Sequence, residues 1–146
     1  MKRIARVLIL ILTFLSIEVV SAFAGGASRT NSEHVVDWGP VMDAIIQVES
    51  NGNPKAVSGN SVGAMQITPI LVAECNKILK ARKVKKRYSL KDRFSVAKSK
   101  EMFLLIQSKH NPLNNLERAI RSWNGGIHFS GRKTQRYFEK VLRAMN

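Results

Sequence analysis

Glu49 occupies the position in this chain that best suits acid–base chemistry. It stands near the end of an apolar helical pattern that includes Ile45, Ile46 and Val48. A carboxyl group near a helix C-terminus meets the negative end of the helix dipole, and apolar surroundings disfavour its ionised form. Both effects raise the pKa, and a carboxyl group protonated near neutral pH can act as a general acid. Taken alone, the same position is more typical of an ordinary exposed glutamate.

Further groups of residues follow in a fixed order. The chain contains Glu49-Ser50, then Ser58, then Gly63-Ala64-Met65-Gln66, then Ser122-Trp123-Asn124-Gly125-Gly126, and then Tyr137 in the last helical pattern. Each group alone is weakly informative, whereas the whole series at workable spacings is specific. The series resembles the lytic transglycosylase family with the soluble-lytic-type (SLT) catalytic domain, which belongs to the lysozyme-like superfamily. The resemblance covers roughly residues 38–142.

The resemblance implies a role for each matching residue. Glu49 matches the catalytic acid/base. The residues expected to contact substrate or frame the site are Ser50, Ser58, Met65, Gln66, Asn124 and Tyr137. Among these, Met65 and Gln66 match residues that line the glycan groove, and Tyr137 matches a tyrosine near the N-acetyl group of the substrate.

The chain departs from the family pattern at three places. Trp123 stands where the family has a tyrosine, which keeps an aromatic ring and changes its polar tip. The loop before Gly63 lacks the usual Gly-Ala pair. The nearest match to an Asp-x-x-x-Asn element is Asp92-Arg93-Phe94-Ser95. These changes concern substrate subsites more than the reaction.

The remaining acidic residues favour a mechanism with one carboxylate. Most glycosidases use two, but Asp43 lies six residues before Glu49 and therefore on another face of the helix. Glu74 and Asp92 belong to no motif. The resemblance implies that Glu49 protonates the bond between N-acetylmuramic acid and N-acetylglucosamine, assisted by the N-acetyl group of the substrate. Glu49 then deprotonates the muramoyl 6-hydroxyl, which closes a 1,6-anhydro ring without cofactor or metal.

Two other functions remain open at this stage. A hydrolytic, lysozyme-type muramidase would use water in place of the 6-hydroxyl group. An inactive wall-binding accessory of a secretion or conjugation apparatus would need no acid at all, and the intact Glu49-Ser50 pair argues against it. The sequence does not separate general wall turnover from a dedicated role with secretion or conjugation machinery.

The N-terminus has the features of a cleaved signal peptide. Positive residues precede an apolar run from Val7 to Leu15, and Ala22-Phe23-Ala24 is a small-x-small cleavage site. We therefore predict a signal peptide at 1–24, a flexible lead-in at 25–35 and the transglycosylase domain at 36–146. Amino-terminal sequencing of the exported protein should begin near Gly25. The predicted product is periplasmic or extracellular, associated with the cell wall and without stable membrane insertion.

The net charge of the whole chain is +14, and removal of the signal peptide leaves about +12. A strongly basic exported protein is expected to accumulate on anionic polymers such as cell walls, and no nucleic-acid-binding motif appears. Between Lys77 and Lys100 there are eleven Lys/Arg residues against one acid, Asp92. This stretch is either a solvated basic face or a surface that binds anionic wall polymer. The three histidines lack the spacing of metal ligands.

The apolar spacing predicts a mostly α, compact, lysozyme-like single domain of about five helices. The expected helices cover roughly residues 40–50, 68–80, 92–109, 115–123 and 134–145. Thr68 followed by Pro69 is a typical helix start. The residues between 51 and 67 are expected to form one long loop without strands. Cys75, the only cysteine, is expected to be a small buried hydrophobe.

Overall fold

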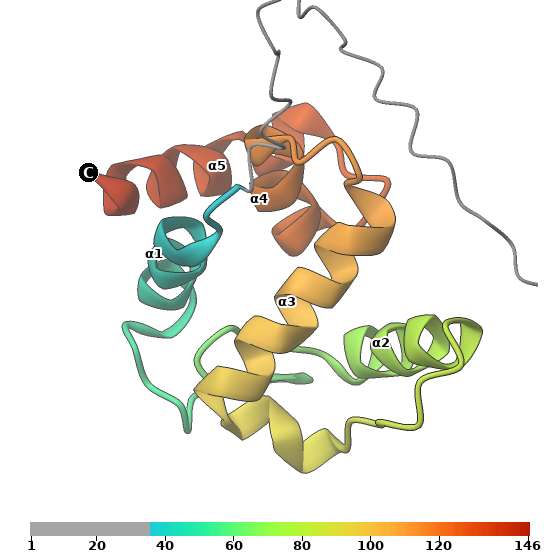
Figure 1. Ribbon diagram of the computed structural model, residues 1–146. Helices are drawn as coiled ribbons and strands as arrows, with labels where there is room; N and C mark the ends of the chain where they lie inside the picture. Colours follow the sequence, from blue (N-terminus) through green and yellow to red (C-terminus); the bar gives the residue numbers. More distant parts are fainter. Residues whose placement is uncertain (1–35) are drawn as a thin grey trace, which may run out of the picture. The chain divides into compact units, whose positions relative to one another are not determined.

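The structure, a computed structural model, describes residues 36–146, with helix α3 (Val96–His110) running through their middle (Figure 1). The other elements in chain order are α1 (Gly39–Ser50), β1 (Val57–Ser58), β2 (Ser61–Val62), α2 (Pro69–Ala81), the 3-10 helix η1 (Leu90–Phe94), α4 (Leu116–Gly125) and α5 (Gly131–Met145). The five α-helices of this part confirm the mostly α fold class. The predicted signal peptide and lead-in lie outside the described residues.

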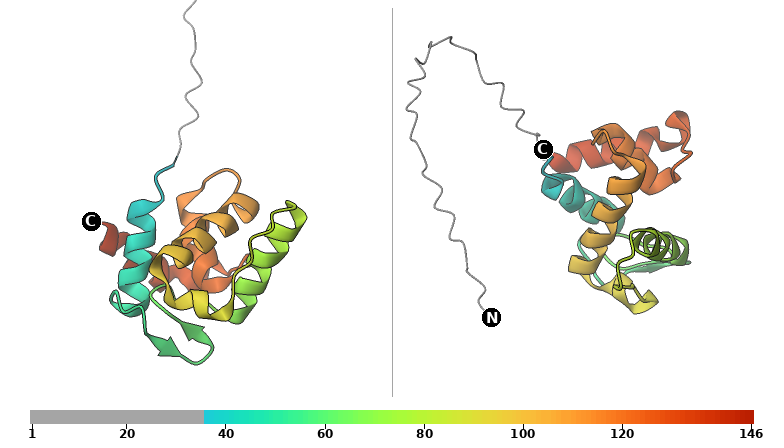
Figure 2. Two further views of the ribbon diagram at one scale, coloured as in Figure 1. Left: turned by 60° about the horizontal axis from the view of Figure 1, so that its bottom comes forward. Right: turned by 45° about the vertical axis from the view of Figure 1, so that its right-hand side comes forward.

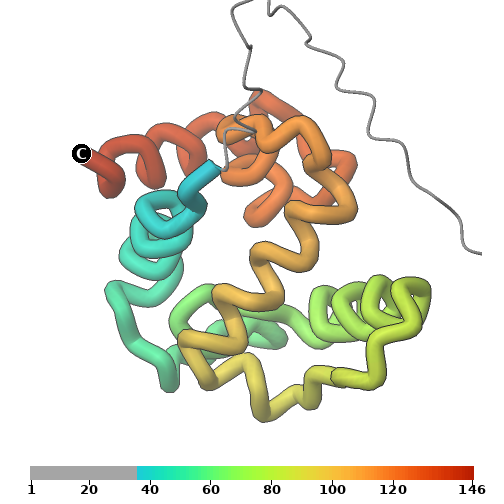
Figure 3. Tube along the Cα trace, viewed as in Figure 1, coloured from blue at the N-terminus to red at the C-terminus, as the bar shows by residue number. Residues whose placement is uncertain are grey.

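The hydrophobic core forms around α3. The side chains of Met102 and Phe103 are fully buried, and the Phe103 ring contacts Trp38 and Trp123 with centroid distances of 5.8 and 5.2 Å. Helices α1 and α4 pack on α5, whereas α2 packs on α3. The tube in Figure 3 and the two views in Figure 2 show the hairpin and α2 on one side of α3, with α1, α4 and α5 on the other. No helix among the described residues is long and apolar enough to cross a membrane.

The helix boundaries nearest the motif residues are those expected from local signals. The side chain of Thr68 accepts a hydrogen bond from the Leu71 amide at 3.2 Å, and Pro69 is the first residue of α2. Helix α1 ends because Asn51 adopts the left-handed conformation, with φ of 53°. The turn places Glu49 and Ser50 in the last turn of the helix, directly before the loop.

The sequence predicts a helix over residues 92–109, whereas α3 begins only at Val96. Ser89 and Asp92 form a capping box, with the Ser89 amide 2.7 Å from Asp92 Oδ2, and this box starts η1. Ser95 then caps a new helix, α3, by accepting a bond from the Lys98 amide at 3.4 Å. The helical phase therefore changes at Ser95. As a result Phe94 and Ala97, expected to face inward, are exposed.

Three smaller differences separate the fold from the sequence-based expectation. Strands β1 and β2 form an antiparallel hairpin inside the expected loop, and two residues per strand are too few to show alternation. Helix α5 begins at Gly131 rather than near residue 134, and the Thr134 hydroxyl lies within its first turn, where it donates to the Ser130 carbonyl at 2.8 Å. Leu116, expected to face the core, is 39% exposed.

Cys75 lies in the core and is fully buried. Burial raises the pKa of its thiol to about 12. A thiol that stays protonated is a poor nucleophile. The expectation of a small buried hydrophobe is confirmed.

Candidate active site

Glu49 lies in the last turn of α1, where its half-buried carboxyl group faces α5. Its Oε1 atom accepts a hydrogen bond from the Tyr137 hydroxyl at 2.7 Å. Burial raises the pKa of Glu49, and the bond from Tyr137 lowers it by a smaller amount. The raised pKa expected from the sequence is confirmed in direction. Glu49 therefore keeps its proton to a higher pH than an exposed glutamate does.

Tyr137 reaches Glu49 because α5 packs along α1. Arg121 of α4 fixes this part of α5: its guanidinium donates to the Gly131 carbonyl at 2.9 Å and to the Thr134 hydroxyl at 3.1 Å. The same group lies 4.4 Å from the centroid of the Phe138 ring, next to Tyr137 in sequence. Arg121 is 6% exposed, and nothing in the motif order indicates its role.

Ser50 joins the end of α1 to the block that follows the hairpin. Its hydroxyl donates to the Ala64 carbonyl at 2.8 Å. The next carbonyl, that of Met65, accepts a bond at 3.2 Å from Trp123 Nε1 of α4. Two helices therefore hold two consecutive carbonyls of the same segment. The Trp123 departure from the family pattern supplies a polar donor that the sequence did not allow us to place.

Gly63 allows this segment to pass under the backbone of η1. Its φ is +79°, and a Cβ atom built on it would lie 1.9 Å from the Arg93 carbonyl oxygen. Arg93 in turn donates from Nη1 to the carbonyls of Asn60 and Ile67, at 3.1 and 3.2 Å. The side chain of Gln66 donates back to the Gly63 carbonyl at 3.0 Å. Arg93 was missed because the sequence shows no partner for it.

The other residues expected in the site are placed less directly. The Met65 side chain is fully buried in the core, so only its backbone reaches the site. Ser58 is exposed on β1, and Asn124 is exposed at the end of α4. The structure brings the side chains of Glu49 and Tyr137 into contact. Within residues 36–146, the side chains of Ser58 and Asn124 form no hydrogen bond.

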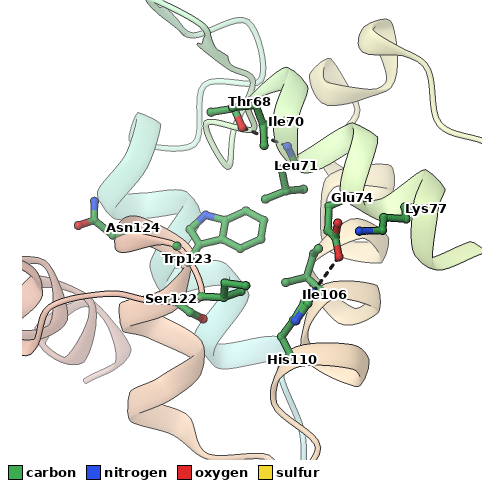
Figure 4. A pocket seen from close by; sticks show the side chains of 12 residues that line it. Thr68, Ile70, Leu71, Glu74, Lys77, Ile106, His110, Ser122, Trp123 and Asn124 are labelled. Carbon is green, nitrogen blue, oxygen red and sulfur yellow. Dashed lines mark hydrogen bonds and ion pairs between the residues drawn. The ribbon is translucent and has the colours of Figure 1, made fainter.

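A cavity of about 580 Å³ lies between α2, α3 and α4 (Figure 4). Trp123 forms part of its wall, so the cavity adjoins the segment held by Ser50. At the end formed by α2 and α3, His110 Nε2 and Glu74 Oε1 lie 3.0 Å apart. The volume is in the range of ligand sites. It is lined by Thr68, Ile70, Leu71, Glu74, Lys77, Ile106, His110, Ser122, Trp123, Asn124, Gly126 and Ile127.

The other acidic residue of α1 does not share the environment of Glu49. Asp43 is exposed and forms an ion pair with Lys100 of α3. Within residues 36–146, no three His, Cys, Asp or Glu side chains gather in a group suited to a metal ion. Burial raises the pKa of Glu49, whereas hydrogen bonds from Lys98 and Lys86 lower the pKa values of Asp92 and Glu101. Exposure and ion pairing therefore set Asp43 apart from the half-buried Glu49.

The described residues therefore form a helical domain in which a tyrosine binds a half-buried carboxyl group, and a cavity adjoins the segment that Ser50 and Trp123 hold. A family model described as Transglycosylase SLT domain matches residues 26–145, and the chain belongs to this family. Membership assigns the domain a lytic-transglycosylase-type function on peptidoglycan. Comparisons with curated proteins and with solved structures gave no significant match.

Replacement of Tyr137 by Phe tests the contact with Glu49. The hydroxyl stabilises the ionised carboxylate, so its loss should raise the pKa of Glu49 further. The limb of the pH–rate profile that reports deprotonation of Glu49 should move to higher pH. The maximal rate should fall about tenfold or more, as for loss of a bond to a charged group. Tyr88→Phe, which removes the bond to Glu101, is the matched control and should leave the profile in place. An unchanged profile in Tyr137→Phe would show that the bond has no part in the reaction.

Proposed function

We propose that this protein is a lytic transglycosylase in which Glu49 is the only general acid/base. The observation that carries the proposal is the half-buried Glu49 carboxyl group, with its raised pKa and its bond to Tyr137. The family membership supplies the substrate class, peptidoglycan. Asp43, turned away and paired with Lys100, is not available as a second catalytic carboxylate.

In the first step protonated Glu49 donates its proton to the oxygen between N-acetylmuramic acid and N-acetylglucosamine, and the bond from that oxygen to the muramoyl C1 breaks. The N-acetyl oxygen of the substrate stabilises the positive charge at C1. Glu49 is now a carboxylate, and the bond donated by Tyr137 stabilises this form. In the second step the Glu49 carboxylate accepts the proton of the muramoyl 6-hydroxyl group, while the oxygen of that hydroxyl group forms a bond to C1. The product is a 1,6-anhydro sugar, and no water is consumed.

The family pattern and the positions of the matching residues support an assignment of the substrate contacts. We assign Ser50 to fixing the catalytic end of α1, since its hydroxyl binds the Ala64 carbonyl. Asn124 lines the cavity and is assigned to the glycan. Ser58 and Gln66, on the hairpin and just after it, are assigned to the same groove. The buried side chain makes Met65 a support of the groove wall rather than a direct contact.

The products of digestion test the proposal. Purified protein should convert peptidoglycan into muropeptides with 1,6-anhydro ends, which mass spectrometry distinguishes because each is one water lighter than a reducing end. Reducing ends in their place would make the protein a hydrolytic muramidase. The absence of any cleavage would favour a wall-binding accessory.

The proposed substrate lies outside the cytoplasmic membrane, so the proposal includes export of the chain. Recovery of the protein in the periplasmic or extracellular fraction with Gly25 near its N-terminus would support the predicted cleavage after Ala24. Recovery of a full-length, membrane-embedded chain would contradict it.

A further inference from the structure

We propose that residues 80–91, named here the basic strap, form a second contact surface for the carboxylate groups of peptidoglycan, separate from the Glu49 site. The identity of the polymer rests on the proposed function. The strap connects α2 to η1 and runs along the outside of the domain (Figure 1).

The charges of the strap are unusually one-sided. It contains no acidic residue, and all its cationic side chains are exposed. Lys86 pairs with Glu101, whereas Lys80, Lys83, Lys85 and Lys91 form no ion pair within residues 36–146. The seven cations are Lys80, Arg82, Lys83, Lys85, Lys86, Arg87 and Lys91. Such a surface attracts a polymer with repeated negative charges.

Contacts with the domain hold the strap in place. The side chain of Asn76 in α2 makes two bonds to the backbone of Tyr88, one to its carbonyl and one from its amide, both 2.8 Å long. Tyr88 is 7% exposed, and its hydroxyl donates to Glu101 at 3.0 Å. An ordered segment loses less conformational entropy when it binds. The strap is therefore a preformed surface rather than a loop that must fold on its partner.

The strap begins where the cavity ends. Lys77 of α2 lines the cavity, and Lys80 follows one turn later on the same helix. A glycan strand longer than the cavity that leaves it along α2 reaches the strap next. Peptidoglycan carries carboxylates on its peptide stems, and on the lactyl groups of muramic acid units that have lost their stem. Such carboxylates can form ion pairs with a row of exposed lysines, whereas an uncharged glycan cannot.

Helix α5 offers a matched control surface. It carries five exposed cations that form no ion pair within the described residues: Arg132, Lys133, Arg136, Lys140 and Arg143. The helix packs on α1 and α4, on the other side of α3 from α2 (Figure 3). Four Gln substitutions on either surface remove the same net charge.

The experiment compares two variants in the full chain, each combined with Glu49→Gln so that binding is measured without cleavage. The strap variant replaces Lys80, Lys83, Lys85 and Lys91 with Gln. The control replaces four of the five α5 cations with Gln, namely Arg132, Lys133, Lys140 and Arg143. Binding to sacculi freed of phosphate polymers should weaken about tenfold or more in the strap variant. Its remaining binding should depend less on salt than that of the parent. Chitin, which has the same linkage without carboxylates, should bind all three proteins equally.

Several outcomes would overturn the proposal. Equal losses in the strap and α5 variants would mean that net charge alone matters, and unchanged binding would reduce the strap to a solvated face. A loss seen only on walls that keep their phosphate polymers would assign the strap to phosphate. Thermal melting at the parent temperature checks that the variants fold. Failure of the protein with native Glu49 to produce anhydro ends would reject the proposed function and leave this binding comparison intact.

Discussion

Glu49→Gln should abolish nearly all cleavage of peptidoglycan while the domain keeps its fold. The amide has nearly the same shape as the carboxyl group, and its oxygen can still accept the bond from Tyr137. It cannot donate and accept a proton at the required pKa. Loss of general acid–base catalysis costs roughly 100- to 10,000-fold in rate, and here one residue serves both steps. Release of anhydro-muropeptides, followed by mass spectrometry, measures the effect.

The matched control for this prediction is Asp43→Asn. Asp43 lies on the same helix, is exposed and pairs with Lys100, so its replacement should change the rate less than twofold, as roughly expected for an exposed pair. Near-normal cleavage by Glu49→Gln, or an equal loss in Asp43→Asn, would require a different mechanism.

Glu49→Gln should also change the dependence of stability on pH. Burial raises the pKa of Glu49 above the ordinary value of a glutamate, so the folded state binds the proton more tightly than the unfolded state does. The stability of the native protein therefore falls as pH rises from the unfolded pKa through the folded pKa. The variant carries no charge there, so its melting temperature should exceed that of the parent at neutral pH. The difference should disappear at acid pH, and a constant difference would argue against a buried, titrating carboxyl group.

Gly63→Ala should give the largest loss of stability among single methyl additions in the site. The residue has φ of +79°, and the new Cβ would lie 1.9 Å from the Arg93 carbonyl oxygen. The carbonyl oxygen belongs to the backbone, and the backbone also fixes the position of the Cβ atom, so no rotamer change relieves the clash. We expect the free energy of unfolding to fall by about 3 kcal/mol or more and the melting temperature by more than about 10 °C. Cleavage should fall as well, because Gly63 precedes the carbonyls that hold Ser50 and Trp123.

Gly52→Ala separates the two causes of that loss. Gly52 has a similar φ of +82°, but nothing lies within 4 Å of the position of its Cβ. This variant carries only the backbone strain and should lose about 1 kcal/mol. Equal melting temperatures for the two variants would show that the approach to Arg93 does not control the fold of this segment.

The sequence by itself determined the helical class, the start of α2 and the candidate acid, because each depends on neighbours along the chain. Apolar residues at helical spacing, the Thr68-Pro69 pair and the apolar setting of Glu49 are local patterns. The same patterns failed where a local signal competed with the apolar period. The capping box at Ser89 ended one helical phase and Ser95 began another, which exposed Phe94.

Only the tertiary structure decided which groups surround that acid. The Tyr137 hydroxyl reaches Glu49 across 88 residues of sequence, and Trp123 reaches the Met65 carbonyl across 58. Neither contact follows from spacing, since each depends on how α5 and α4 pack against the rest of the core. The same packing buries the Met65 side chain, expected at the groove, and brings the Arg93 carbonyl over Gly63. The pattern of residues therefore indicates the candidate acid, while long-range packing sets its pKa and its partners.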